Sequence, residues 1–318
     1  DCDSVDATVA YVAGNSEPFR FTDEQAGREL ETDAIRARIE ASILNLSPET
    51  EALKPKEISP KVYRVELENA TVLRARVIVP LSGSAAAQEN AALAAVQFQG
   101  VRIEPGESLS FNQTVGMRTE ESGYTAAEEP AYGQNIVGVG GGVCQVASVL
   151  YYCTLKSDLE VIARQEHQYV PDYIPWGMDA TIYWGSLDYK FRNNTTYPIR
   201  ILAEASGGYV RVRFMGTETK DYTVELDYKA AMTHKSKTEE VEISKGMKNY
   251  DKYKDYKDGE RIQVGYDGYE VDTYRMKYDK NGKLLSTEKV NHSSYDWRNR
   301  LVAKLVEETE PPTEAPTE

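Results

Sequence analysis

The chain of 318 residues is long enough for two or three domains of about 100–200 residues each. Its 37 basic and 51 acidic residues give a formal net charge of −14, which argues against nucleic acid as a main partner, because phosphate binding needs a basic surface. The three cysteines, Cys2, Cys144 and Cys153, cannot all pair within the chain, and so few of them argue against a disulfide framework.

Apolar periodicity along the chain predicts a multidomain α+β fold. Residues 1–70 are predicted to form a small α+β unit, and residues 71–216 a central mixed domain in which a glycine-rich turn leads into a helix packed on antiparallel strands. The elements predicted in these two regions are helices at 34–46, 85–98 and 144–156 and strands at 7–12, 19–21, 53–65 (approached through a loop), 71–79, 159–164, 180–184, 187–191, 199–203 and 209–214.

Residues 217–306 are predicted to form a small antiparallel β module, with hairpin turns at Asp267-Gly268 and Asn281-Gly282. Residues 307–318 form a tail of Pro, Thr and Glu with no packing potential, as is typical of the tethers of cell-surface domains. The sequence shows no signal peptide and no apolar run of about 18 residues. We therefore expect an extracellular protein, associated with a cell wall or membrane, whose N-terminal anchor lies outside this sequence.

The residues that carry the clearest chemical signal are three glycines followed by Val143, Cys144 and Gln145. Glycines permit a tight turn and close backbone approach, and the helix start offers unpaired N–H groups and a positive dipole end. A thiol in that place ionises more readily, and the thiolate is the reactive form. Cys144 is therefore a candidate nucleophile.

Helical periodicity separates the two cysteines of this segment. Cys153 shares one apolar face with Val143, Val146 and Leu150, which predicts a buried and inert thiol. Cys144 lies off that face, on the side of Ser148 and Tyr151. Nine positions along one helix span roughly 13 Å, too far for a disulfide between the two cysteines.

Two polar residues that follow complete a candidate catalytic set. His167 comes after the strand predicted at 159–164, and Asp179 after a turn at 175–177. Cysteine at a helix start, then histidine, then aspartate is the order found in transglutaminase-like and papain-like folds, where histidine takes the thiol proton and the acid orients the imidazole. Gln145, or backbone N–H groups of the glycine turn, would supply an oxyanion hole.

A structural interpretation stays open beside the catalytic one: the glycines shape a turn, Cys144 fills a pocket, and His167 and Asp179 pair to hold a corner. Arg164 either binds a substrate carboxylate or pairs with Asp179 or Asp188, and Trp176 either lines a groove or belongs to the core. No metal-ligand spacing such as C-x-x-C is present, and we expect neither a metal nor a cofactor. The candidate binding residues are Gly141, Gly142, Gln145, Ser148, Arg164 and Trp176.

Over residues 95–215 the chain resembles the VanW family, which is named from vancomycin-resistance gene clusters. The motifs that carry the resemblance, in order, are Gly-Glu-Ser-Leu-Ser-Phe-Asn at 106–112, Gly-Tyr at 123–124, the segment 140–148, Arg164, His167, Tyr173, Pro175, Gly177, Asp-Ala-Thr at 179–181, and residues 188–194. Residues 5–65 resemble the peptidoglycan-binding domain that often precedes VanW, and residues 220–305 resemble a G5-type β module.

The resemblance implies a bacterial, Gram-positive-type cell-envelope protein with peptidoglycan or a related wall polymer as its partner. It does not imply a reaction. Two hypotheses therefore stand: Cys144-dependent acyl transfer or hydrolysis on wall peptides, of a transglutaminase or transpeptidase kind, or peptidoglycan or glycan binding without turnover.

Overall fold

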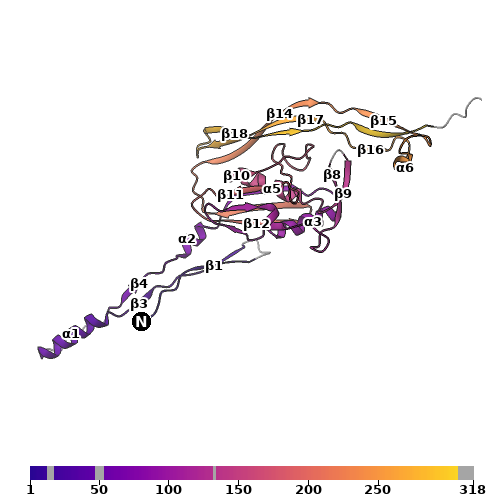
Figure 1. Cartoon of the computed structure of the whole chain (residues 1–318). Coiled ribbons are helices and arrows are strands. Elements are labelled where there is room, and N and C mark those ends of the chain that lie inside the picture. The colour runs from indigo at the N-terminus through magenta and orange to yellow at the C-terminus, as the bar shows by residue number, and fades with distance from the viewer. Residues whose placement is uncertain (13–17, 47–53, 132–133, 307–318) are drawn as a thin grey trace, which may run out of the picture.

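The computed structural model describes residues 1–12, 18–46, 54–131 and 134–306, and its helices and strands confirm the α+β class (Figure 1). The expected tail at 307–318 lies outside the described residues. Figure 1 shows three parts: an N-terminal arm, a central mixed body, and a long β layer that lies across that body.

The N-terminal arm consists of small elements that extend away from the central body (Figure 1). Its helix α1 was predicted, but none of its residues is buried, and Leu44 is 82% exposed. The elements are β1 (Thr8–Tyr11) paired with β2 (Phe19–Thr22), β3 (Gly27–Glu29) paired with β4 (Lys56–Ile58), α1 (Thr32–Leu44) and α2 (Arg64–Asn69).

The central body is built on an antiparallel sheet in the order β5-β13-β12-β6. Alternation of buried and exposed residues along β5 places one face of this sheet against the core. A second sheet, in the order β10-β11-β7, completes the body. The strands are β5 (Val72–Pro80), β6 (Arg102–Ile103), β7 (Ser108–Ser110), β10 (Glu160–Ala163), β11 (Lys190–Arg192), β12 (Ile199–Ser206) and β13 (Tyr209–Gly216).

Two helices fill the space beside these sheets, with α3 (Ala85–Val96) against β12 and α5 (Cys144–Lys156) against β5 and β13. The small buried side chains of α3, including Ala91 and Ala94, allow it to pack closely, and Ser84 caps its first turn by accepting from the Ala87 N–H at 3.3 Å. A short helix α4 (Phe111–Val115) and a hairpin of β8 (Ala126–Ala131) and β9 (Gln134–Val139) complete this part.

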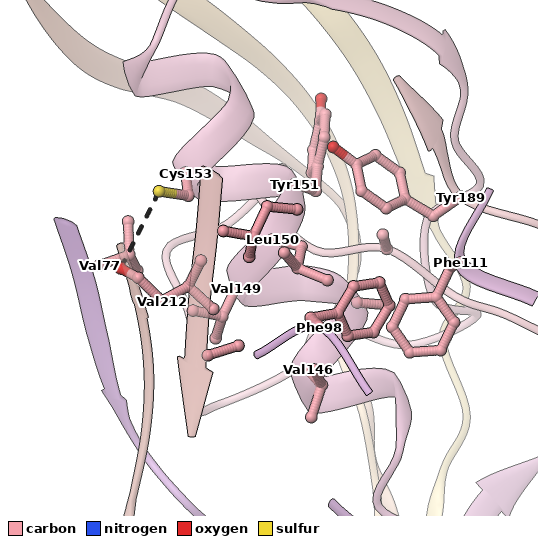
Figure 2. Packing of buried hydrophobic residues seen from close by; sticks show 14 of the residues in the cluster. Val77, Phe98, Phe111, Val146, Val149, Leu150, Tyr151, Cys153, Tyr189 and Val212 are labelled. Atoms are coloured by element: carbon pink, nitrogen blue, oxygen red, sulfur yellow. Dashed lines mark hydrogen bonds between the residues drawn. The ribbon is translucent and has the colours of Figure 1, made fainter. Parts of the chain in front are cut away.

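The predicted face of α5 is confirmed, since Val143, Val146, Leu150 and Cys153 are all buried. Figure 2 shows Cys153 turned toward the Val212 carbonyl, while Tyr151 and Tyr189 lie on another side of the helix. Burial raises the pKa of the Cys153 thiol, which keeps it protonated and inert. All three cysteines are free.

The C-terminal β layer is made of two three-stranded sheets, in the orders β14-β17-β18 and β15-β19-β16. The first lies on the central body, where Leu226 and Val290 pack against the main core. Its elements are β14 (Thr223–His234), β15 (Thr238–Ile243), α6 (Tyr250–Tyr253), β16 (Arg261–Gln263), β17 (Gly268–Tyr278), β18 (Leu284–Tyr295) and β19 (Arg300–Leu305).

Several details of the predicted strands are wrong. The strand predicted at 187–191 begins only at Lys190, and in the described part of the one predicted at 53–65 only β4 forms, since Arg64 begins α2. Residues 180–184 form no strand, and Tyr183 makes only an isolated bridge to Leu187, because the polar groups of this segment bond to side chains and to the Gln165 carbonyl. Asp267-Gly268 joins no hairpin, since β16 and β17 belong to different sheets. The module is not wholly antiparallel, because β15 pairs with β19 in parallel. The turn at Asn281-Gly282 does join the hairpin of β17 and β18.

Candidate active site

The glycine turn before α5 is shaped by close backbone packing. Gly142 has φ +97°, and a Cβ on it would lie 2.3 Å from the Ala87 carbonyl oxygen at the start of α3. A Cβ on Gly141 would lie 2.9 Å from the Ala127 carbonyl oxygen. Only glycine permits both the left-handed backbone and the contact with α3. These two glycines, candidates for ligand binding, therefore seat the start of α5 against its neighbours.

Cys144 is the first residue of α5 and is partly exposed. Its Sγ lies 3.7 Å from the carbonyl oxygen of Ile182. The helix begins without a side-chain cap, and within the described part of the chain no acceptor bonds the Cys144 N–H. The thiol therefore sits at the positive end of the helix dipole, next to a backbone donor that is available to a ligand.

The structure brings the three predicted catalytic residues together. Asp179 is fully buried, and its Oδ2 lies 2.7 Å from His167 Nδ1 and 2.8 Å from the His167 backbone nitrogen. A carboxylate only accepts hydrogen bonds, so Nδ1 carries a proton and Nε2 is the nitrogen left for the thiol. Cys144 is one of the groups that raise the pKa of His167, so the two side chains lie close enough to interact.

The electrostatics of this group favour a protonated histidine. Burial alone would lower the pKa of His167, but hydrogen bonds to Asp179 and Cys144 and the charges of both groups raise it to about 10. Burial likewise opposes ionisation of Asp179, yet the hydrogen bond and charge of His167, together with Arg164, hold the pKa of Asp179 well below its usual range. The site is therefore built to hold an imidazolium next to a carboxylate at neutral pH.

Arg164 pairs with Asp179, which is the second of the two roles predicted for it. Its Nη2 lies 3.0 Å from Asp179 Oδ1 and its Nε 2.7 Å from the Asp179 carbonyl oxygen. The remaining N–H groups reach Glu166, Ser293 and the Gly177 carbonyl at 2.8–3.4 Å. All five donors of the guanidinium thus have partners inside the protein. Asp188, the other partner considered, instead accepts from Ser110 and Asn112.

The other candidate binding residues have structural partners. The Gln145 amide is bound to Ser82 on both sides, at 2.8 Å through Oε1 and 3.1 Å through Nε2. Ser148 is fully buried and links the Cys144 and Ala180 backbones. Trp176 packs on Tyr228 and Tyr269 of the C-terminal β layer, with ring centroids 5.8 and 4.5 Å away.

Two tyrosines at the site were not assigned a role from the sequence. Tyr173 lies edge-on to the His167 ring, with centroids 6.3 Å apart, and its hydroxyl lies 3.0 Å from Ser148 Oγ. Tyr295 donates to Asp179 Oδ1 at 2.5 Å from β18, more than a hundred residues further along the chain. Tyr173 belongs to the motif series quoted above, whereas no local pattern marks Tyr295.

Among the residues that the structure describes, no group of three or more His, Cys, Asp or Glu side chains is arranged to hold a metal ion. None of their helices combines the length and hydrophobicity needed to cross a bilayer.

We predict that the protein becomes less stable as the pH rises from about 7 to 10. His167 titrates with a pKa of about 10 in the folded state against 6.5 ordinarily. The contribution of His167 to the free energy of unfolding is complete below pH 6.5. It is lost as the pH rises through the pKa of the folded state, by up to about 1.4 kcal/mol per pH unit. Urea unfolding of wild type and His167→Gln at pH 6, 7, 8 and 9 measures how the free energy of unfolding depends on pH. Equal pH slopes in the two proteins would contradict the prediction.

The fold and the site together define an α+β domain in which a glycine turn brings a cysteine at a helix start against a histidine–aspartate pair. Residues 86–215 match the family described as VanW like protein, so this part of the chain is similar to that family.

Two curated relatives extend the likeness. The chain is 39% identical over 127 residues to the uncharacterized protein YoaR of Bacillus subtilis, which covers 40% of this chain and 42% of YoaR. It is 29% identical over 203 residues to the vancomycin B-type resistance protein VanW of Enterococcus faecalis, which covers 61% of this chain and 68% of that protein. The chain thus spans less than half the length of YoaR.

Among solved structures, the crystal structure of HP0197-G5 aligns over 27% of this chain and 99% of its own chain, at 16% identity and a TM-score of 0.15. That likeness is too weak to define a G5 domain here.

Proposed function

We propose that this protein acts at the bacterial cell envelope as a cysteine-dependent acyl transferase or hydrolase on wall peptides. The observation that carries the proposal is the line from Asp179 through His167 to Cys144, with a 2.7 Å bond between Asp179 Oδ2 and His167 Nδ1. A nucleophile, a base and an orienting acid in that relation are the parts that thiol acyl transfer requires.

In this mechanism the reactive state is a Cys144 thiolate beside a protonated His167. The sulfur attacks the carbonyl carbon of a peptide amide, and the Cys144 N–H is placed to donate to the developing oxyanion. When the carbon–nitrogen bond breaks, His167 Nε2 gives its proton to the departing amine, leaving a thioester on Cys144. Water or a second amine then attacks the thioester, its proton passes to His167, and the thiolate leaves.

The high pKa of His167 decides how this cycle begins. A histidine with a pKa near 10 is already protonated at pH 7, so it serves first as the acid and takes a proton only in the second half of the cycle. Asp179 keeps that proton on Nδ1 and the ring in place. This order differs from the base-first cycle of a neutral histidine.

The wall peptide as substrate, peptidoglycan or a related polymer as partner, and an extracellular, wall- or membrane-associated location all belong to the proposal. Support comes from the similarity of residues 86–215 to the VanW-like family and from the name of the Enterococcus faecalis relative, which connects that protein with vancomycin resistance. The net charge of −14 also disfavours nucleic acid as a partner.

Binding without turnover is the second candidate, and two exposed aromatic residues favour it. Tyr183 and Trp184 are 60% and 41% exposed, directly after Ile182, whose carbonyl contacts the Cys144 sulfur. Aromatic faces beside a site are suited to sugar or peptide ligands. In this case Cys144, His167 and Asp179 would hold the loop that carries the aromatic residues.

We predict that Cys144→Ala abolishes turnover while leaving the fold intact, because the variant lacks the nucleophile and Cys144 is only partly buried. Purified muropeptides are incubated with each protein and analysed by mass spectrometry for hydrolysed or cross-linked products. Cys153→Ala is the matched control, since it removes a thiol from the same helix and should retain activity. If wild type retains wall fragments in a pull-down but returns them chemically unchanged, the protein is a binding protein and catalysis is wrong.

A further inference from the structure

The C-terminal β layer reaches the candidate site through one row of side chains on β18. Asn291, Ser293 and Tyr295 alternate along this strand, so they share one face. Ser293 is fully buried and Tyr295 is 2% exposed. The same face of β17 contributes Thr273, which packs so closely on Gly177 that a Cβ on this glycine would lie 2.1 Å from the Thr273 hydroxyl oxygen. The segment that ends at Asp179 is thus enclosed by the β layer.

Each residue of this row bonds either to the segment that holds Asp179 or to Arg164, which is itself bonded to Asp179. Asn291 donates to the Gly177 carbonyl at 3.0 Å, and Ser293 accepts from Arg164 Nη1 at 2.8 Å. The Tyr295 hydroxyl accepts from the Gly177 N–H at 3.0 Å and donates to Asp179 Oδ1 at 2.5 Å. Asp296 continues the contact by donating its N–H to the Gln168 carbonyl at 2.7 Å.

The two oxygens of Asp179 divide their partners. Oδ2 accepts hydrogen bonds from the backbone N–H and from Nδ1 of His167, while Oδ1 accepts hydrogen bonds from Arg164 and Tyr295. The bonds to Oδ1 set the rotation of the carboxylate about its Cβ–Cγ bond, and that rotation determines where Oδ2 points. Burial and the neighbouring Asp179 charge raise the pKa of Tyr295, so its hydroxyl stays protonated and remains a donor.

We propose that Tyr295 is a positioning residue for the Cys144–His167–Asp179 site, so that the C-terminal β layer is a required part of this site and not a separable module. The inference rests on the proposed function. Tyr295 acts on the thiol and the imidazole only through Asp179, by holding that carboxylate in the orientation in which Oδ2 meets His167 Nδ1.

The test compares Tyr295→Phe with Tyr222→Phe in the full chain. Tyr222 is the matched control, because its hydroxyl donates to Asp158 at 2.5 Å, which is also a bond between the β-layer region and the central body but lies outside the site. The pKa of His167 is measured by NMR titration, with its signal assigned through His167→Gln. The rate of Cys144 alkylation by iodoacetamide at pH 7 is measured in a Cys2→Ser background, since Cys153 is buried.

We expect Tyr295→Phe to move the pKa of His167 by at least about half a unit and to slow alkylation about ten-fold, as follows from losing one hydrogen bond to a buried charge. Tyr222→Phe should change neither quantity. A folded Tyr295→Phe protein that lacks either change overturns the proposal, since a merely structural tyrosine would lower the melting temperature and leave the titration unmoved.

A second variant keeps the test decisive if Tyr295→Phe does not fold. Ser293→Ala removes one of the two partners of Arg164 Nη1 and leaves Glu166, so it acts on Asp179 through Arg164, and we expect a smaller change in the same two quantities. The experiment also distinguishes failure of this inference from failure of the proposed function. If wild-type Cys144 does not react, the proposed function is wrong, and the His167 titration alone decides whether Tyr295 is a positioning residue. If wild type is active and Tyr295→Phe behaves like it, only this inference fails.

Discussion

Asp179→Asn is expected to lower the free energy of unfolding by about 3–5 kcal/mol, the usual cost of removing one partner from a buried ion pair. Asp179 is fully buried and accepts hydrogen bonds from Arg164, His167 and Tyr295. With Asn in its place, the Arg164 guanidinium, whose side chain is 6% exposed, keeps only Glu166 as a charged partner. We therefore expect the variant to remain folded at low temperature but with much reduced stability.

The same substitution is expected to remove most thiol reactivity at pH 7. Burial lowers the pKa of His167, and the hydrogen bond to Asp179 is the largest of the factors that raise it, followed by the hydrogen bond to Cys144 and the charge of Asp179, so in Asp179→Asn this pKa should fall. Alkylation of Cys144 and urea unfolding measure the two effects. Asp188→Asn is the control, since this carboxylate is also largely buried and bonded to Ser110 and Asn112. Equal loss of reactivity in both variants would contradict a specific role for Asp179.

Gly142→Ala is expected to cost about 4 kcal/mol of stability and to displace the start of α5. The new Cβ would lie 2.3 Å from the Ala87 carbonyl oxygen, in a backbone conformation of φ +97°. The left-handed conformation contributes about 1–2 kcal/mol and the overpacking about 1–3 kcal/mol. Because the clash is with backbone, α3 and α5 must separate, and Cys144 moves with its helix.

Gly106→Ala separates these two contributions. Gly106 also has a positive φ, of +78°, but nothing lies within 4 Å of the place that a Cβ on it would occupy, so only the conformational cost applies. Urea unfolding should show a loss of about 1–2 kcal/mol for this variant, and its Cys144 alkylation should match wild type. If Gly142→Ala is no less stable than Gly106→Ala, the contact between the glycine turn and α3 is not the reason for the glycine.

The site was predictable as far as local patterns extend. The glycine run and the spacing of three and four in α5 placed Cys144 at a helix start and Cys153 in the core, because both features depend on residues only a few positions apart. His167 and Asp179 were selected by residue type and order, and the structure brings them together. The roles of Gln145 and Ser148 were less predictable, since the direction of a side chain is decided by what packs around it.

The larger arrangement was predictable only in part. The strands at 199–203 and 209–214 appeared because alternation is a local property, and β12 and β13 confirm them. The segment 180–184 has the same apolar character, but its backbone groups bond to Ser148 and Gln165, so no strand forms. The exposed apolar residues of α1 show the same limit, because helical spacing predicts a helix but not the surface that covers it.

The sequence by itself determined the class of the fold, the helix that begins at Cys144 and the separate environments of the two cysteines on that helix. Each follows from residue type and short-range periodicity, which act within a few turns of the chain. Only the tertiary structure decided that Arg164 faces Asp179, and that Tyr295 completes the carboxylate's partners from β18. These contacts join residues far apart in the chain, and packing of the β layer on the central body brings them within bonding distance.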